Sequence, residues 1–156
     1  MNISLSRLLC LIAAWLWLVG SVNAQNLLMV RTPQPFEATM NVLQQTLAEY
    51  GYAVGHVQRC DGGMADFGYK SDLYRVVFFG KLAEVRELSA KYPELIPYLP
   101  LKILLFAERD QTVLVALNPL ELAGRYEARQ LQVQFLRWHS DLRAVLQEVQ
   151  DFRPPG

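Results

Sequence analysis

Hydrophobic residues along this chain gather in short runs and at helical spacing, and the two patterns alternate. The short runs are five to eight residues long and are bounded by polar or turn-forming residues, which predicts β-strands. They cover residues 27–31, 52–59, 74–81, 102–107 and 112–117. The last two runs flank the polar residues 108–111, so we expect them to form a hairpin.

Hydrophobic residues at steps of three and four predict three helices. The first covers residues 36–50 and is followed by Gly51, a residue type that commonly ends helices. The second covers residues 82–92, and three prolines between 93 and 100 then predict an irregular link. The third covers residues 128–152 and carries the longest amphipathic stripe of the chain.

The last predicted helix is long for the domain that carries it. Its 25 residues would rise about 37 Å, whereas a domain of this size has a radius of gyration of about 14 Å. The helix therefore spans the molecule, breaks near Ser140, or projects toward a partner. Core packing is the simplest use of its stripe, and a homodimer through this C-terminal helix is the alternative. The stripe consists of Leu131, Phe135, Trp138, Leu142, Val145 and Val149.

These elements together predict a single α+β domain. The runs at 74–81, 102–107 and 112–117 are apolar on consecutive positions, as in strands covered on both faces. Two short helices would cover one face, so we expect the last helix to cover the other. The domain would span residues 25–125, with an amphipathic helix and tail at 126–156 packed on it. Its sheet would be mixed, mainly antiparallel, with about five strands in the order β-α-β-β-α-β-β-α.

The first 24 residues have the layout of a secretory signal peptide. Arg7 precedes an unbroken apolar run over residues 8–19, and mostly small residues follow up to Ala24. A helix of 12 residues rises only about 18 Å, against roughly 30 Å of bilayer hydrocarbon. This difference favours cleavage after Ala24 over an uncleaved membrane anchor. We therefore expect a periplasmic or secreted protein with no stable membrane span after cleavage.

Charge and cysteine content narrow the choice of partners. The chain has 15 basic and 15 acidic residues, and Arg7 is the only charged one among the first 24. The remainder therefore carries a formal charge of −1 without a basic cluster, which argues against nucleic-acid binding. Cleavage would also remove Cys10 and leave Cys60 as the only cysteine, which excludes an intramolecular disulfide.

The segment 60–72 is a candidate ligand site. It contains three glycines and three aspartates, and its 13 residues exceed the roughly two to six of an ordinary connection. Long loops are frequently functional, so Cys60, Asp61 and Tyr69 are candidate ligand-binding residues. The alternative is a glycine-rich crossing with a structural role.

His56, Cys60 and Met64 are spaced four residues apart and form a candidate metal site. On an extended strand His56 and Cys60 would share one face. Imidazole, thiolate and thioether together suit copper(I), so copper would be the cofactor under this hypothesis. Two alternatives stay open: Cys60 is a reactive or mixed-disulfide thiol with Arg59 favouring its thiolate, or all three residues are structural.

The sequence contains no recognisable catalytic constellation. His139, Ser140 and Asp141 have the residue types of a hydrolase triad, but consecutive helical residues point about 100° apart. The chain also lacks a G-x-S-x-G elbow, the phosphate-binding glycine motifs and a C-x-x-C pair. These absences favour a protein that is not an enzyme.

Three stretches of the chain resemble the Domain of Unknown Function 302 family. They are YRVVFFGK at 74–81, YPELIPYLPLKILLFA at 92–107 and VLVALNP at 113–119. Tyr98 stands where many members carry an acidic residue. The resemblance implies a small α+β domain, and it implies no activity and no catalytic residue.

Three functional hypotheses follow from the sequence. The first is an exported, non-catalytic binding or accessory domain for a small ligand or an envelope protein. The second is a soft-metal or thiol-redox protein that acts through Cys60. The third is an enzyme of unrecognised type.

Overall fold

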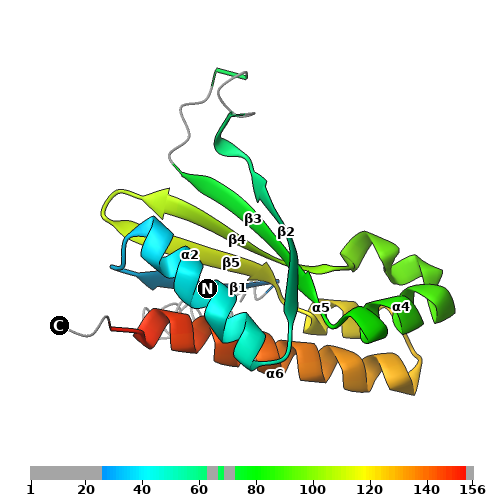
Figure 1. Cartoon of the computed structure of the whole chain (residues 1–156). Helices are drawn as coiled ribbons and strands as arrows, with labels where there is room; N and C mark the ends of the chain where they lie inside the picture. The colour runs from blue at the N-terminus through cyan, green and yellow to red at the C-terminus, as the bar shows by residue number, and fades with distance from the viewer. Residues whose placement is uncertain (1–25, 63–66, 69–72, 154–156) are drawn as a thin grey trace, which may run out of the picture.

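The computed structural model describes residues 26–62, 67–68 and 73–153 of the chain. These residues form one antiparallel sheet with helices against one face and at one end (Figure 1). This arrangement confirms the expected α+β fold with a long C-terminal helix. No helix within the described ranges is both long and apolar enough to cross a membrane.

The sheet has five strands in the spatial order β1-β5-β4-β3-β2. All four pairings are antiparallel, so the sheet is not mixed in the described residues. The first and last strands of the chain lie side by side, because β1 pairs with β5 and brings Leu27 opposite Leu117. The strands are β1 (Leu27–Thr32), β2 (Ala53–Arg59), β3 (Tyr74–Gly80), β4 (Leu101–Glu108) and β5 (Gln111–Leu117).

Five helical segments connect or follow these strands, and two of them were not expected. The link after the second helix is a 3-10 helix, η1, and a short helix, α5, precedes the last one. Asn118 fixes the start of α5, because its side-chain oxygen accepts the N–H of Leu120 at 3.1 Å. The segments are α2 (Phe36–Glu49), α4 (Leu82–Lys91), η1 (Pro93–Tyr98), α5 (Leu120–Ala123) and α6 (Arg129–Asp151).

Two turns show why the strands meet as they do. Glu108 pairs with Gln111, so the β4–β5 hairpin has a two-residue loop, and Arg109 adopts a positive φ of 57° in it. Gly51 adopts a φ of 76° after α2, and this left-handed residue reverses the chain into β2.

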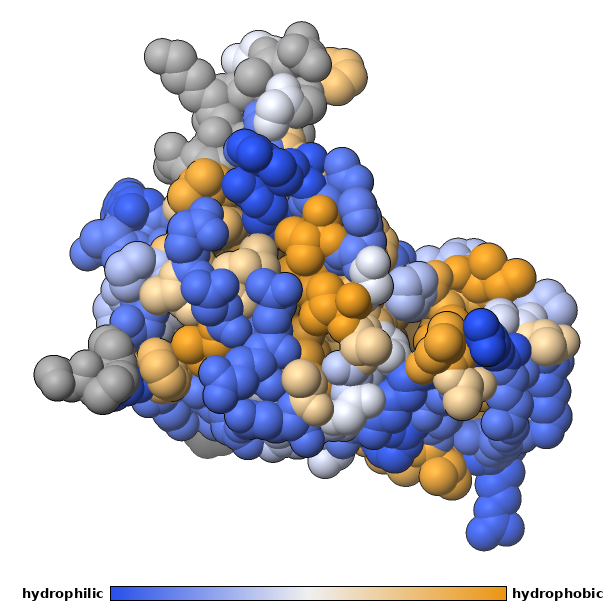
Figure 2. All heavy atoms as spheres, viewed as in Figure 1, coloured by the Kyte–Doolittle hydropathy of each residue, from blue (hydrophilic) through white to orange (hydrophobic). Residues whose placement is uncertain are grey.

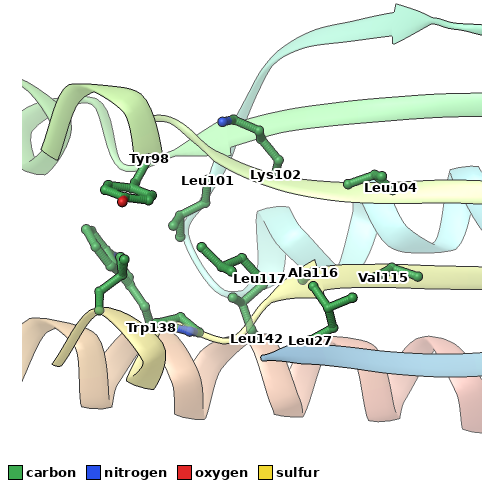
Figure 3. Close-up of a pocket in the computed structure, with 12 residues that line it drawn as sticks. Leu27, Tyr98, Leu101, Lys102, Leu104, Val115, Ala116, Leu117, Trp138 and Leu142 are labelled. Atoms are coloured by element: carbon green, nitrogen blue, oxygen red, sulfur yellow. The ribbon is translucent and has the colours of Figure 1, made fainter. Parts of the chain in front are cut away.

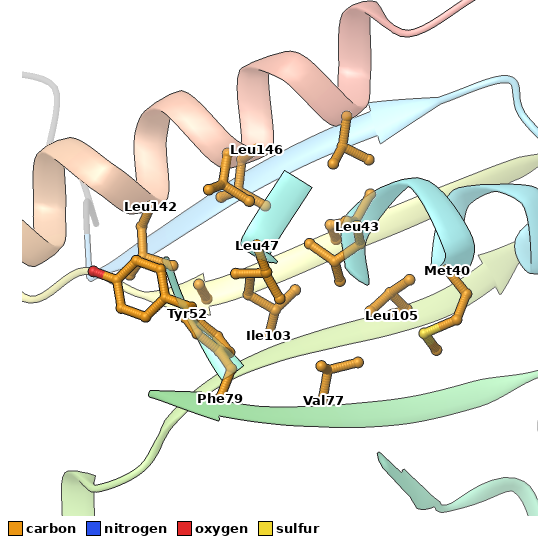
Figure 4. Packing of buried hydrophobic residues seen from close by; sticks show 14 of the residues in the cluster. Met40, Leu43, Leu47, Tyr52, Val77, Phe79, Ile103, Leu105, Leu142 and Leu146 are labelled. Carbon is orange, nitrogen blue, oxygen red and sulfur yellow. The ribbon is translucent and has the colours of Figure 1, made fainter. Parts of the chain in front are cut away.

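The main core lies between the sheet and the helices α2 and α6 (Figure 4). Leu43 and Leu47 of α2 face Ile103 and Leu105 of β4, and all four side chains are fully buried. Leu146 of α6 packs into the same cluster. The two helices therefore share one face of the sheet.

The position of α6 corrects one expectation. The sequence predicted that the last helix covers the second face of the sheet, but α6 lies beside α2 on the first face (Figure 1). The helix is unbroken at Ser140, and its 23 residues extend about 34 Å. Its apolar stripe is buried along the whole length, so core packing is its use.

The N-terminal half of α6 builds a second, smaller core. Phe135 and Trp138 of α6 are buried with Leu88 of α4, Leu95 of η1 and Leu122 of α5. This cluster lies beyond the end of the sheet, where α4, η1 and α5 gather (Figure 1). The single helix α6 thus holds two cores together.

The opposite face of the sheet, called the outer face below, has no described helix against it (Figure 1). Its side chains alternate with the core residues along each strand. On β4 the inward residues Ile103 and Leu105 are fully buried, whereas the alternating residues Leu104 and Phe106 are partly exposed. On β5 the outward residues Val113 and Val115 are buried, so the middle of the outer face is apolar and only partly exposed.

Candidate functional site

An apolar pocket of about 250 Å³ lies where the outer face of the sheet meets the second core. Leu27, Leu104 and Leu117 line it from three different strands. Tyr98 of η1 and Trp138 of α6 line its other end (Figure 3). The pairing of β4 with β5 and of β5 with β1 brings these segments together, and α6 closes the pocket with Trp138.

Polar groups are few in this pocket. Of its twelve lining residues, only Tyr98, Lys102 and Trp138 carry a polar side-chain atom. The Lys102 ammonium donates to the Pro97 carbonyl oxygen at 3.2 Å, and Arg125 donates to the Tyr98 hydroxyl at 3.4 Å. Both cations are therefore held against η1 at the pocket.

The lining of this pocket has few side chains that could take part in a reaction. None of the pocket's lining residues is a carboxylate, a histidine, a cysteine or a serine. A general acid–base pair or a nucleophile with its base needs proton-transferring side chains within hydrogen-bond reach of the reacting atom, and of this lining only Tyr98 and Lys102 are of such a type. Ligand pockets without chemistry are mostly apolar, with a small number of polar groups that fix orientation.

A polar cluster lies behind the pocket on α6. The Trp138 indole N–H donates to Glu84 at 2.8 Å, and Arg137 forms an ion pair with the same carboxylate. Arg137 also lies 3.5 Å from Asp141, which accepts the Tyr52 hydroxyl at 2.6 Å. Burial and this hydrogen bond raise the pKa of Tyr52 above its ordinary value of 10.0. The cluster fixes the position of the Trp138 ring.

The three adjacent residues with triad chemistry do not converge. His139 places Nδ1 2.8 Å from the side-chain oxygen of Asn118, whereas Asp141 bonds to Tyr52, and Ser140 is exposed. Burial and the nearby Arg143 lower the pKa of His139 below 6.5. The geometry agrees with the sequence argument that this trio is not a hydrolase site.

Of the three predicted ligand-binding residues, Cys60 and Asp61 fall within the described residues and Tyr69 lies outside them. Asp61 Oδ1 accepts a hydrogen bond from Arg75 Nη1 at 2.6 Å, and Asp61 Oδ2 lies 3.4 Å from Arg59 Nη2. Desolvation raises the pKa of Asp61, but a backbone hydrogen bond and Arg59 outweigh it, so the net pKa is lowered below 3.8. Asp61 thus anchors the segment after β2 to β3.

Cys60 is partly buried directly after β2. Its amide donates to Tyr74 at 3.1 Å and so extends the strand pairing by one residue. Its Sγ lies 3.9 Å from the Gln58 carbonyl oxygen. The reactive-thiol hypothesis stays a prediction, and thiol labelling of the native protein tests it.

The copper hypothesis also stays a prediction. His56 is exposed on β2, with Nε2 3.2 Å from the Gln58 side chain and its ring against Phe78. Met64 lies outside the described residues. Within the described ranges, no three His, Cys, Asp or Glu side chains are grouped so that they could hold a metal.

A second cavity, of about 370 Å³, lies beside the bulge in β2 at Gly55. It is lined by Gly55, Phe78, Leu82 and Pro100 among others, and Figure 2 shows hydrophobic side chains gathered between β2 and α4. All of its lining residues are apolar or glycine. Because no polar side chain is present to orient a ligand, the first pocket is the stronger candidate.

Sequence analysis missed the first pocket. Tyr98 and Lys102 lie on either side of a Leu-Pro-Leu stretch, and Trp138 is one of several residues in a helical stripe. Each position is explained equally well by core packing. Leu27 also lies in an apolar run like a core residue, and only the structure shows that it is 52% exposed.

Comparison with known proteins identifies the family. The family model for the domain of unknown function DUF302 matches residues 28–149. The fold is similar to the crystal structure of an uncharacterized conserved DUF302 protein from Bacillus stearothermophilus, with a TM-score of 0.71 and 16% sequence identity. That match covers 81% of this chain and 99% of the other. No curated protein matches the sequence. Because the family model covers most of the chain, the protein belongs to the DUF302 family.

Proposed function

We propose that this protein is a non-catalytic binding domain whose first pocket receives the apolar part of a small ligand. The observation that carries the proposal is the lining of that pocket, which joins an apolar cavity of about 250 Å³ to three polar side chains. Trp138 already donates to Glu84, so Lys102 and Tyr98 are the polar lining groups that remain, and Arg125 donates to the Tyr98 hydroxyl. An anionic or hydrogen-bond-accepting end of the ligand would therefore lie beside η1.

Trp138 provides a direct probe of binding. The chain has three tryptophans, and cleavage after Ala24 would remove Trp15 and Trp17 and leave Trp138 as the only one. A ligand in the pocket would then quench or shift the only indole emission. We expect N-phenyl-1-naphthylamine, a neutral apolar dye, to bind with saturable one-to-one stoichiometry and to accept energy from Trp138.

Two substitutions localise the dye. Leu117→Arg places a charge in the pocket from a side chain that is 40% exposed, and we expect it to abolish saturable binding. Leu136→Arg changes an exposed apolar residue of α6 outside the pocket and should leave binding unchanged. Absence of saturable binding, or equal binding by both variants, would contradict the proposal.

A related anionic dye tests the role of the cations. The dye 8-anilinonaphthalene-1-sulfonate has a similar aromatic body and adds a negative charge. If Lys102 orients an anionic end of the ligand, Lys102→Gln should lower the affinity for the anionic dye several-fold more than the affinity for the neutral dye. Equal loss for both dyes would show that Lys102 contributes packing only.

We also propose that the chain is exported and cleaved after Ala24. Support comes from Arg7, the apolar run over residues 8–19 and the small residues that follow. The intact mass of protein released by osmotic shock should then correspond to a chain that begins at Gln25. A full-length mass in the membrane fraction would overturn this proposal.

A further inference from the structure

The first pocket passes around the end of the sheet (Figure 3). Leu104 and Leu117 line it from the outer face, because they alternate along their strands with the core residues Ile103 and Ala116. Leu142 lines it from α6, which packs on the opposite face of the sheet. A cavity with walls from both faces of a sheet follows a bent course, and a flexible chain can follow such a course.

The wall of this cavity is mainly aliphatic. Nine of its twelve described lining residues are Leu, Val, Ala or Pro. Leu27 and Leu117 expose 52% and 40% of their surface, so the cavity opens to solvent beside β1. An aliphatic wall stabilises a ligand by removing apolar surface from water, and it offers neither ring stacking nor hydrogen bonds. Such a wall favours a ligand part that consists of CH2 groups.

Donors without a described counter-charge lie at the η1 end of the cavity. The bond from Lys102 to the Pro97 carbonyl oxygen uses one of the three N–H groups of the ammonium. Arg125 donates to the Tyr98 hydroxyl oxygen, and that hydroxyl keeps its own proton as a donor. None of the ion pairs among the described residues includes Lys102 or Arg125. An incoming anion would therefore meet hydrogen-bond donors that no described carboxylate neutralises.

We propose that the ligand of the first pocket is an unbranched aliphatic monocarboxylate with about eight carbon atoms. Its carboxylate would lie beside η1 with Lys102 and Tyr98, and its chain would follow the aliphatic wall toward Leu27. This inference rests on the binding function proposed above, and it specifies the chemical class of the ligand.

The volume of the cavity sets the length of the chain. A water molecule takes up about 30 Å³ of the liquid, and a CH2 group is of similar size. The cavity of about 250 Å³ therefore holds about eight such groups. The CH2 groups of a longer chain would lie outside the cavity and would bury less apolar surface.

A series of chain lengths tests the proposal on protein purified from cells that express the full coding sequence. Isothermal titration calorimetry measures the affinities for hexanoate, octanoate, decanoate and dodecanoate directly. Each CH2 group that enters the cavity should raise the affinity about fourfold. We expect this increment between hexanoate and octanoate and a clearly smaller one between decanoate and dodecanoate. Absence of octanoate binding, or one constant increment throughout the series, would overturn the proposal.

Three probes with the same chain length test the carboxylate. Octanoate carries a negative charge, 1-octanol is neutral and octylamine carries a positive charge. Octanoate should bind several-fold more tightly than 1-octanol, because hydrogen bonds to a charged group are stronger than those to a neutral one. Octylamine should bind most weakly, because its ammonium would lie beside Lys102. Equal affinities for the three probes would show that the pocket does not select an anion.

Two variants test the position of the carboxylate. Lys102→Gln removes the charge at the cavity, so it should lower the affinity for octanoate several-fold and change the affinity for 1-octanol little. Lys91→Gln is the matched control, because it removes the same charge from an exposed lysine of α4 that does not line the cavity. It should leave both affinities unchanged. Equal losses of octanoate affinity in both variants would mean that the net charge of the protein, and not Lys102, attracts the anion.

Competition between octanoate and the neutral dye separates this inference from the proposed function. Displacement of N-phenyl-1-naphthylamine by octanoate would support both. Saturable dye binding without octanoate binding would overturn the ligand class and leave the binding function standing. Octanoate that binds without displacing the dye would occupy another site, which also overturns the inference. If neither probe binds, both proposals are wrong.

Discussion

The hydroxyl oxygen of Tyr52 lies 2.6 Å from a carboxylate oxygen of Asp141, and this hydrogen bond joins the beginning of β2 to α6. Tyr52 is 4% exposed, and its ring also meets Phe79 edge-on at 5.4 Å. The Lys81 ammonium lies over the Tyr52 ring, with Nζ 4.7 Å from the ring centre. The phenol is therefore fixed by contacts to α6, to β3 and to the residue that joins β3 to α4.

Tyr52→Phe should lower the free energy of unfolding by about 1.5–3 kcal/mol, because it removes a partly buried hydrogen bond to a charged group. Tyr50→Phe is the matched control. It removes a tyrosine–carboxylate bond to Glu148 on the surface, where solvent weakens the interaction, so we expect a clearly smaller loss. Urea unfolding of the two variants measures both values. Equal losses would show that burial does not strengthen the Tyr52 contact.

Alkaline pH should destabilise the protein through the same residue. The unfolded chain ionises Tyr52 near pH 10.0, whereas the folded chain keeps it protonated because its pKa is raised. The contribution of Tyr52 to stability is therefore complete below about pH 10 and is lost as the pH rises toward the folded pKa. The free energy of unfolding of Tyr52→Phe should fall less steeply above pH 10 than that of the natural protein. Parallel curves would contradict this assignment.

Acid pH should release the anchor at Asp61. Because the folded pKa of Asp61 is lowered below 3.8, its contribution is present above that value and is lost as the pH falls through the folded pKa. The stability difference between the natural protein and Asp61→Asn should be constant near neutrality and should shrink below about pH 4. Asp110→Asn, in the exposed hairpin loop, is the control. If the stability difference persists at acid pH, the cost of Asp61→Asn comes from replacing the carboxyl group by an amide and not from the loss of the negative charge.

Gly80→Ala should destabilise the junction of β3 and α4. A Cβ atom at this position would lie 2.8 Å from Cγ2 of Val85, so the Val85 side chain or helix α4 must shift, at a cost of about 1–3 kcal/mol. The same substitution in a Val85→Ala background should cost much less, because the clashing methyl group is gone. Gly124→Ala has no heavy atom within 4 Å of its Cβ and should be neutral or stabilising. Chemical denaturation of the four variants checks these values.

Much of the fold was predictable from local patterns. Strand and helix bounds differ from the expected ones by one or two residues, because short apolar runs and helical spacing are local properties. The helix α5 was missed although Asn118, Pro119 and Gly124 are the residue types that start and end helices. The position of α6 was not predictable, because a stripe such as Leu142 and Val145 shows which side of a helix is buried and not which sheet face buries it.

The candidate site was not predictable for a related reason. Leu27 and Leu117 are 90 positions apart and become neighbours only through the register of β1 against β5. The type of an apolar residue does not show whether its side chain lines a pocket or belongs to a core. Sequence reasoning instead selected Cys60 and His56, whose chemistry is visible in single residues, and the structure brings no further described metal-binding side chains to them.

The pairing of β1 with β5 also determines when the sheet can be completed. Asn26 accepts the amide of Asn118 at 2.9 Å, and the strand pairs that follow join residues about as distant in sequence. The β4–β5 hairpin closes through a two-residue loop, whereas β1 pairs with residues that lie 80 to 90 positions later in the chain. Contacts of this range slow folding, so the edge strand at the beginning of the chain should be the last to dock during refolding. During synthesis β1 therefore stays without its strand partner until the chain has grown past Leu117.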